Sequence, residues 1–244
     1  MLNIRPIRGG VSAMSRANVK DKRKAQLIAA ALESIAKRGL METTITHISK
    51  GAGMSRGIIN FYFTSKEMML RETLKTLIDE YEAEWGEALA KSGDAGRSRL
   101  NAVLKVHFDK KLCSARRLNV MSAFWGHAAT QSAYRAQLEA ADAKIETALT
   151  EALAHALSSS LEEARHAATQ LHALIRGLWL NYMLNPQGVN RETLLEEATS
   201  FVDRLAGAPI RIVKETEKPA AVKPKPKKAE EPKQLDIEDL FAVR

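Results

Sequence analysis

A helical period of about 3.6 residues recurs from Asp21 to Ala206, and it restricts the fold of this chain more than any other feature. Between Asp21 and Arg38 the apolar side chains fall on one stripe, and Gly39 supplies the stop. Longer helices are predicted at Lys66–Lys91, Arg97–Leu112, Ala115–His127, Ser132–Leu157, Leu161–Leu184 and Arg191–Ala206. Because no convincing strand or internal repeat interrupts them, the pattern predicts an all-α fold.

Two short helices are predicted between the first helix and Lys66. Thr44 is a good N-cap for a helix whose inward face is Ile45, Ile48 and Ala52. Gly53 and Met54 then form a turn, and Ser55 caps a helix that ends near Tyr62. Two helices joined by a glycine-containing turn, the second short and polar, are typical of a helix-turn-helix.

Basic residues are concentrated in the same part of the chain. The first 75 residues hold 14 Lys and Arg against 5 Asp and Glu, whereas the remaining 169 hold 23 against 24. A basic end joined to a nearly neutral body indicates a polyanion-binding end, although a solvated basic face would have the same composition. The helix-turn-helix favours double-stranded DNA as the polyanion.

The second short helix carries side chains suited to a DNA groove. We expect base contacts from Arg56 and Asn60, a close approach at Gly57, and a methyl contact from Ile58. Met54 and Ile59 are expected to pack inward against Ile48 and Leu32. Groups at helix ends are expected to hold phosphates, namely those of Thr44, Ser55, Tyr62 and Lys66.

The spacing of these residues resembles the TetR family of one-component repressors. The resemblance is carried by Thr44-Ile45-x-x-Ile48-Ser49-x-x-Ala52-Gly53-Met54-Ser55-x-Gly57-x-Ile59-x-x-Tyr62-Phe63-x-x-Lys66. The segment GIIxxYF and two later stretches, His107–Trp125 and Leu174–Leu184, resemble the BetI-type branch, which comprises choline-responsive repressors of glycine betaine synthesis. The resemblance spans roughly residues 22–205 and implies a helical ligand-binding and dimerisation domain after the DNA-binding domain.

The family implies a homodimer with two DNA-binding heads on a palindromic operator, and one small-molecule effector pocket in each subunit. The last two predicted helices are strongly apolar, so we expect core and dimer contacts there, with a purely internal bundle as the alternative. The candidate interface residues are Leu171, Leu178, Leu194, Ala198, Phe201, Val202 and Leu205.

A quaternary ammonium effector would need an aromatic cage and a carboxylate. The candidates for the pocket are Phe108, Asp109, Phe124, Trp125, Arg176, Trp179 and Tyr182, each of which could instead pack in the core. The branch pattern places an acid before Gly-Leu-Trp, whereas this chain has Arg176. If Arg176 lines the pocket, it disfavours a cation and favours an anionic effector.

Other classes of protein find little support. No nucleophile elbow, phosphate-binding loop, dinucleotide fingerprint or metal-ligand spacing is present, so we predict no enzyme, cofactor or metal. A helical interaction module without DNA binding remains as the rival class. A single cysteine, no apolar run long enough for a membrane span and no signal peptide predict a cytoplasmic protein without membrane contact.

The expected domains follow from these boundaries: a flexible basic arm (1–19), a DNA-binding domain (20–66), a ligand-binding and dimerisation domain (67–206) and a Lys- and Pro-rich disordered tail (207–244). The arm contains a second methionine, Met14, at which translation could start instead of Met1. A longer arm that touches the minor groove is the alternative.

Overall fold

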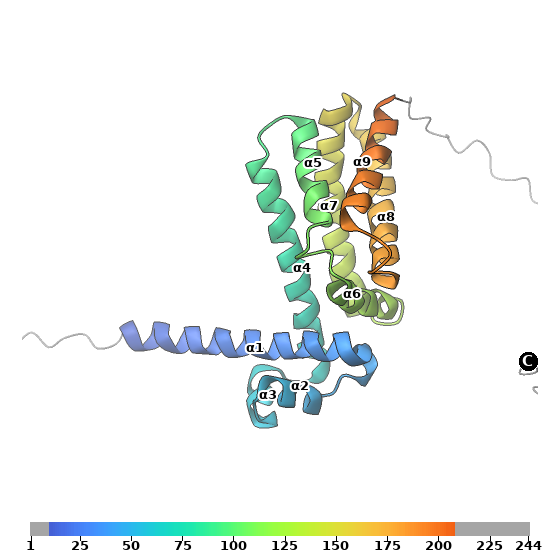
Figure 1. The fold of residues 1–244 in the computed structure, drawn as a ribbon. Coiled ribbons are helices and arrows are strands. Elements are labelled where there is room, and N and C mark those ends of the chain that lie inside the picture. Colours follow the sequence, from blue (N-terminus) through green and yellow to red (C-terminus); the bar gives the residue numbers. More distant parts are fainter. Residues whose placement is uncertain (1–9, 208–244) are drawn as a thin grey trace, which may run out of the picture. The chain divides into compact units, whose positions relative to one another are not determined.

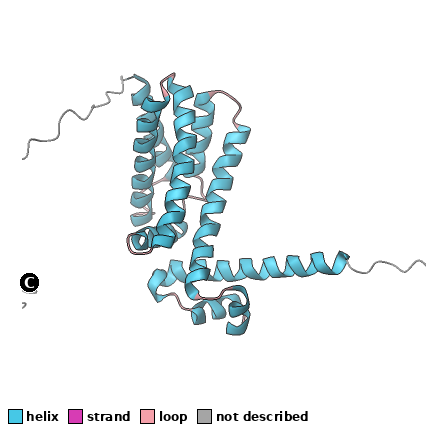
Figure 2. Cartoon of the chain, turned by 180° about the vertical axis from the view of Figure 1, so that it is seen from behind, coloured by secondary structure: helices cyan, strands magenta, loops and turns pink. Residues whose placement is uncertain are grey.

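A computed structural model describes residues 10–207 of the chain, with side chains from residue 18 onward. Every regular element in that part is a helix (Figures 1 and 2). The helices are α1 (Gly10–Glu42), α2 (Ile45–Ala52), α3 (Arg56–Tyr62), α4 (Lys66–Lys91), α5 (Gly96–His107), α6 (Ala115–Ala128), α7 (Ser132–Leu157), α8 (Leu161–Leu184) and α9 (Arg191–Gly207). The predicted all-α fold is confirmed.

The helix boundaries mostly agree with prediction, with two exceptions. The helix α1 begins at Gly10 rather than at Asp21, so residues 10–19, which belong to the predicted arm, are helical. The helix α5 ends at His107 instead of Leu112, because the chain turns there and the Asp109 carboxylate accepts the Lys111 N–H at 2.8 Å. The predicted tail, apart from Gly207, and residues 1–9 lie outside the described residues.

Buried side chains form three apolar clusters, and α4 takes part in all of them. Near its start Met69 packs with Ile48 and Ile59 in a small cluster between α1, α2 and α3. Leu74 packs farther along with residues of α1, α6 and α7, and Tyr81 borders the largest cluster. No linker therefore separates the two predicted domains near residue 66, since one continuous helix is shared by both sets of packing contacts.

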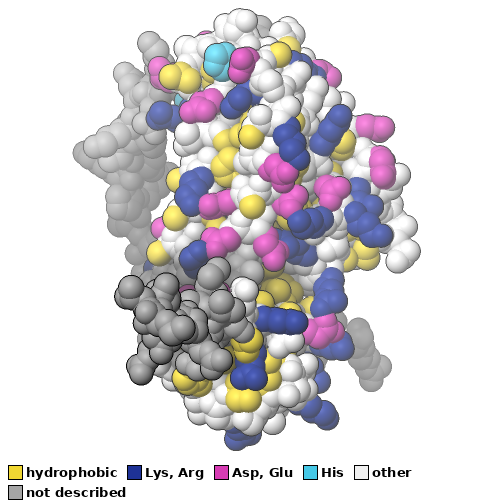
Figure 3. All heavy atoms as spheres, turned by 90° about the vertical axis from the view of Figure 1, so that its left-hand side faces the viewer, with side chains coloured by type: hydrophobic (Ala, Val, Ile, Leu, Met, Phe, Trp, Pro, Cys, Tyr) yellow, Lys and Arg dark blue, Asp and Glu magenta, His cyan; other side chains and the backbone are white. Residues whose placement is uncertain are grey.

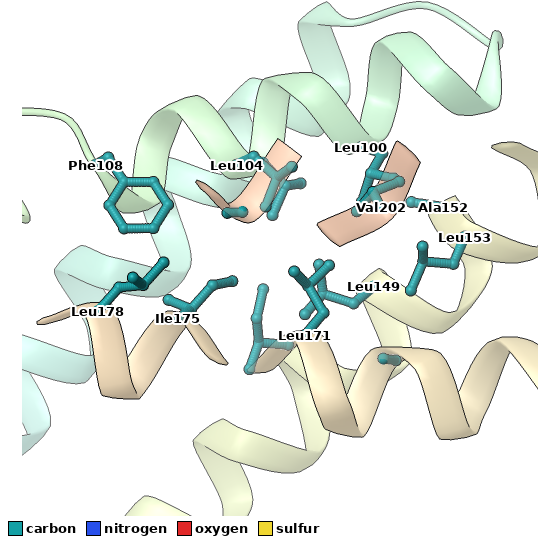
Figure 4. Packing of buried hydrophobic residues seen from close by; sticks show 14 of the residues in the cluster. Leu100, Leu104, Phe108, Leu149, Ala152, Leu153, Leu171, Ile175, Leu178 and Val202 are labelled. Atoms are coloured by element: carbon teal, nitrogen blue, oxygen red, sulfur yellow. The ribbon is translucent and has the colours of Figure 1, made fainter. Parts of the chain in front are cut away.

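The largest cluster lies between α5, α7, α8 and α9. Figure 4 shows Leu104 of α5 and Ile175 of α8 turned toward the same interior, with Leu149 of α7 beside them. Such side chains are fully buried, so each stabilises the fold by roughly 1.5–3 kcal/mol through loss of water contact.

The same packing bears on the predicted dimer contacts. Five of the seven candidates are at most 9% exposed within one subunit and offer little surface to a second one: Leu171, Leu178, Leu194, Ala198 and Val202. The other two, Phe201 and Leu205, are half-buried at the edge of the same cluster. The five buried residues pack within their own subunit, two of them from α8 and three from the apolar stripe of α9.

The exposed face of α8 offers other apolar groups. Leu180 is 48% and Leu184 71% exposed, and Ala173 lies two turns before Leu180 on the same stripe. At Gly177, between them, an added Cβ would meet no atom within 4 Å. We call Ala173, Gly177, Leu180 and Leu184 the α8 face. This face is apolar and exposed, and two of its four residues have small side chains or none.

Across residues 10–207 no helix has both the length and the apolar character required to cross a membrane. No group of His, Cys, Asp and Glu side chains in that range could hold a metal ion. The single cysteine, Cys113, is buried, and burial raises the pKa of its thiol to about 11.

Candidate nucleic-acid interface and internal cavity

Local hydrogen bonds set the geometry of α2 and α3. The Thr44 hydroxyl accepts the His47 N–H at 3.2 Å, and the Ser55 hydroxyl accepts the Ile58 N–H at 3.4 Å, so both predicted caps are confirmed. Gly53 ends α2 with a φ of 63°, a conformation that favours glycine. These caps and this turn hold the two short helices at a defined angle.

The face of α3 that points away from the core is exposed. Ile59 is fully buried against Ile48, as predicted, whereas Arg56, Gly57 and Asn60 are exposed and Ile58 is half-buried. An added Cβ at Gly57 would meet only the Ser55 Oγ, at 3.8 Å. The surrounding atoms of the described structure therefore leave room for a side chain at position 57. The space left by the missing side chain lies on the outer side of α3.

Arg56 and Lys66 already contact the domain that carries them. The Arg56 guanidinium donates to the Thr46 hydroxyl of α2, and the Lys66 ammonium donates to the Met41 carbonyl at 3.2 Å. Each contact uses one of several donors and leaves others for a second partner. Tyr62 is half-buried against the small cluster, with its ring partly available at the surface.

Sequence reasoning missed Phe61. This side chain is 73% exposed on α3, and its ring makes an edge contact with the Tyr62 ring at 5.2 Å. Its position one residue after Asn60 on a short exposed helix could have indicated it. Together with Arg56, Gly57, Ile58 and Asn60 it forms what we call the reading face.

Exposed basic side chains also lie on α1 and α2. Lys50 of α2 and Lys20, Lys22 and Arg23 of α1 are exposed. In the view of Figure 3, Lys and Arg prevail at the lower end of the molecule, whereas both signs of charge mix over the remaining helices. The charge asymmetry of the sequence therefore corresponds to a surface beside α2 and α3.

An internal cavity opens between α4, α6, α7 and α8. The centre of a water-sized sphere can occupy about 50 Å³ of it, within about 540 Å³ of empty space that includes open solvent. Its apolar lining comprises Leu77, Ile78, Leu112, Leu118, Met121, Leu138 and Ala141; its aromatic and polar lining comprises Tyr81, Arg117, Trp125, Asp142, His172, Arg176 and Trp179. A lining that is mostly apolar and aromatic, with a few charged groups among it, is typical of small-molecule sites.

Three of the seven predicted pocket residues line this cavity: Trp125, Arg176 and Trp179. The other four do not line it. Phe108 and Phe124 are buried in apolar clusters, Asp109 is exposed beyond the end of α5, and Tyr182 packs at the edge of the largest cluster. Tyr81, Asp142 and His172 were missed, since only the packing of distant helices brings them to the cavity.

His107 orients two of the aromatic rings from behind the cavity wall. Its Nδ1–H donates to the Val103 carbonyl at 2.7 Å, and its Nε2 accepts the Tyr81 hydroxyl at 2.7 Å. The Trp179 Nε1–H donates to the His107 carbonyl at 2.8 Å. Burial lowers the pKa of His107 to about 4, so the ring is neutral at pH 7 and these hydrogen bonds persist.

Arg176 contacts both a carboxylate and an aromatic ring of the cavity. Its guanidinium donates to the Asp142 carboxylate and lies 5.6 Å from the centre of the Trp125 ring. The Trp125 and Trp179 rings are nearly parallel, with centres 6.4 Å apart. Burial, and then the charge of Arg176, lowers the pKa of His172, whose Nδ1–H donates to Glu146 at 3.2 Å.

Arg117 connects the cavity to α4. It donates to the Glu80 carboxylate at 2.7 Å and to the Leu77 carbonyl at 2.9 Å, both on α4. The preceding residue, Arg116, forms an ion pair with Glu33 of α1. The first turn of α6 thus contacts the cavity, α4 and α1.

Comparisons with known proteins agree with this architecture. Residues 27–73 match the family described as bacterial regulatory proteins, tetR family, and residues 96–207 match the BetI-type transcriptional repressor, C-terminal. The HTH-type transcriptional regulator BetI of Burkholderia mallei is 31% identical over 192 residues, covering 79% of this chain and 97% of the relative.

Solved structures share the fold. A proposed transcriptional regulator from Pseudomonas aeruginosa PAO1 is 25% identical with a TM-score of 0.69, over 77% of this chain and 91% of that one. A proposed regulator from Saccharomonospora viridis, solved in complex with choline, has a TM-score of 0.68 at 19% identity, over 76% and 97% of the two chains.

Proposed function

Because the chain belongs to the TetR family of DNA-binding regulators and carries a BetI-type repressor domain, we propose that a small molecule bound in its cavity releases it from operator DNA. The observation that carries this proposal is the continuity of α4. Lys66 stands at its start beside the DNA-binding helices, and Leu77, Ile78 and Tyr81 line the cavity about three turns later. A ligand that shifts these residues also shifts the start of the helix.

The reading face is proposed to enter the major groove, as the second helix of a helix-turn-helix does. Arg56 and Asn60 have the donor and acceptor groups that distinguish guanine and adenine, and Phe61 and Ile58 suit the thymine methyl group. The hydroxyls of Thr44 and Ser55 accept backbone N–H groups and can still donate to phosphates, beside Tyr62 and Lys66.

Two copies of the chain are proposed to bind one palindromic operator, with their heads about 34–36 Å apart. The α8 face supports this, because it is apolar and exposed in a single subunit. Helices that carry small residues such as Ala173 and Gly177 can approach a second helix closely. A regulator of chromosomal DNA in bacteria works in the cytoplasm, which is the proposed location.

The first candidate effector is choline or a related compound of glycine betaine synthesis. The BetI name of the relatives and the choline complex of the Saccharomonospora viridis protein support it. The proposed targets are then genes of choline oxidation and transport. The paired Trp125 and Trp179 rings are the kind of surface that binds quaternary ammonium groups.

The second candidate is an unrelated effector that carries a negative charge. The observation that favours it is Arg176, whose guanidinium already lies against Trp125 and pairs with Asp142. The geometry favours this second class over a bare cation.

Fluorescence anisotropy on the DNA upstream of the protein's own gene tests the proposal. We expect saturable binding that weakens steeply with salt, and release when a cavity ligand is added. Typical coupling free energies of about 1–3 kcal/mol predict a roughly fivefold to 150-fold loss of affinity on release. Absence of saturable binding to that fragment and to any fragment selected from random DNA would exclude a DNA-binding function.

A further inference from the structure

A charged side chain of the protein already covers part of the aromatic surface of the cavity. The Arg176 guanidinium lies over the Trp125 ring at 5.6 Å, within the distance at which cations bind aromatic faces. The same guanidinium pairs with Asp142, the carboxylate among the cavity's lining residues. The two features that a quaternary ammonium would use are therefore both engaged by a cation of the chain itself.

We propose that the cavity takes a small ligand that bears a carboxylate, and that this carboxylate replaces Asp142 on Arg176. The inference rests on the proposed function only in treating the cavity as the effector site. It names the group by which the effector is recognised, and it assigns opposite roles to Arg176 and Asp142. Arg176 attracts the ligand, and Asp142 competes with it.

The chemistry of the guanidinium supports a carboxylate. Arginine presents five N–H donors in a planar fork that matches the two oxygens of a carboxylate. The bond to Asp142 occupies one of them, and the Arg176 side chain is 38% exposed, so an incoming ligand can reach it. The Asp142 side chain demonstrates that a carboxylate fits beside this guanidinium.

The other charged groups of the cavity direct the ligand toward Arg176. Arg117 is only 15% exposed and is committed to Glu80 and to the Leu77 carbonyl. Burial and the charge of Arg176 lower the pKa of His172, which is bonded to Glu146. The rest of the lining is apolar or aromatic, so the body of the ligand should be a hydrocarbon, an aromatic ring or a methylated group.

Pairs of ligands that differ only in the recognised group provide the test. Isothermal titration calorimetry of the full chain is carried out with glycine betaine against choline, and with benzoate against benzyl alcohol. In at least one pair the carboxylate member should bind at least about tenfold more tightly than the alcohol, as one charge-assisted hydrogen-bonded pair predicts. Alcohol members that bind as tightly as the carboxylates in both pairs would overturn the proposal.

Two variants separate the proposed roles from a general loss of folding. Arg176→Gln should abolish the preference for the carboxylate and strengthen choline binding, because the aromatic face becomes available. Asp142→Asn should instead strengthen carboxylate binding several-fold, because the competitor is removed. The matched control is Arg165→Gln, an exposed arginine three turns earlier on α8 that does not line the cavity, and it should leave all affinities unchanged.

The outcomes are distinguishable from those of the proposed function. A carboxylate preference that survives Arg176→Gln, or an Asp142→Asn variant that weakens carboxylate binding, contradicts the inference even when the protein binds operator DNA normally. Conversely, failure to bind DNA in the anisotropy experiment refutes the repressor function and leaves the calorimetric preference to be measured independently. Thermal melts of each variant verify that the fold is retained.

Discussion

The reading face and the cavity satisfy their polar groups in opposite ways. On the reading face Asn60 and Gly57 are exposed, and Arg56 makes one contact within its own domain. In the cavity Arg176 is paired with Asp142, Arg117 with Glu80, and Tyr81 with His107. DNA can therefore bind by adding contacts, whereas a cavity ligand has to exchange contacts with the chain.

The two sites therefore respond differently to the loss of a side chain. In the proposed mode of DNA binding, loss of an exposed side chain on the reading face removes a contact with DNA and leaves the fold intact. Loss of a paired group in the cavity leaves its partner unsatisfied, so folding and ligand choice change together.

The largest effect is expected at the reading face. The double substitution Arg56→Ala with Asn60→Ala should weaken operator binding about 100-fold, since each base contact contributes roughly 1–3 kcal/mol. Unfolding in urea should be unchanged within about 0.5 kcal/mol, because both side chains are exposed. Unaltered operator affinity would show that α3 does not read bases.

The cavity wall should respond to pH through His107. Its pKa falls from 6.5 to about 4 on folding, so the unfolded chain binds more protons between those values and stability decreases as the pH is lowered. We expect a loss of about 2 kcal/mol between pH 7.5 and pH 5, measured by urea unfolding. In His107→Gln the same pH step should lower the free energy of unfolding clearly less. An equal loss would assign the pH dependence to other groups.

Phe61 tests whether apolar contacts add to the reading face. Phe61→Ala should weaken operator binding about fivefold, because a contact with a thymine methyl removes about one methyl group's surface from water. Replacing the contacted thymine by uracil should have a similar effect in the wild-type protein. In the Phe61→Ala variant the uracil substitution should have no further effect, and additive losses would argue against the contact.

Lys66 should act on affinity without acting on sequence choice. Lys66→Ala is expected to weaken binding to operator DNA and to non-specific DNA by the same few-fold factor. The slope of log affinity against log salt should decrease by about one, as for the loss of one phosphate contact. A selective loss at the operator alone would assign Lys66 to base reading.

The smallest effect is expected where the two regions are joined. Arg116 and Glu33 form an exposed ion pair between α6 and α1, and such pairs contribute about 0–1 kcal/mol. Arg116→Ala should leave the operator affinity of the ligand-free protein nearly unchanged. A saturating cavity ligand weakens operator binding by a certain factor, and in Arg116→Ala this factor should be smaller by no more than about fivefold. Anisotropy with and without ligand measures the factor.

The two regions also differ in how far they could be predicted from sequence. Thr44, Gly53 and Ser55 act on neighbours within five residues, so the caps, the turn and the exposed face of α3 follow from local rules. The cavity depends on which faces of α4, α6, α7 and α8 meet. Phe124 and Trp125 are adjacent in sequence, yet one is buried against Tyr134 and the other lines the cavity.

The remaining errors have physical reasons as well. Residues 11–20 contain neither glycine nor proline, so α1 continues through a segment whose charge suggested a flexible arm. On α9 the apolar stripe was identified correctly, but periodicity does not tell whether a stripe meets its own chain or another copy. Leu194, Ala198 and Val202 meet their own chain.

Cys113 makes this protein convenient for chemical labelling. It is the single cysteine of the chain, it is buried, and its thiol is protonated at neutral pH. A cysteine introduced at the exposed Lys50 of α2 would therefore react with a maleimide dye or a nitroxide almost without background. In a dimer the two labels report the separation of the heads, and energy transfer or electron resonance would follow that separation as ligand is added.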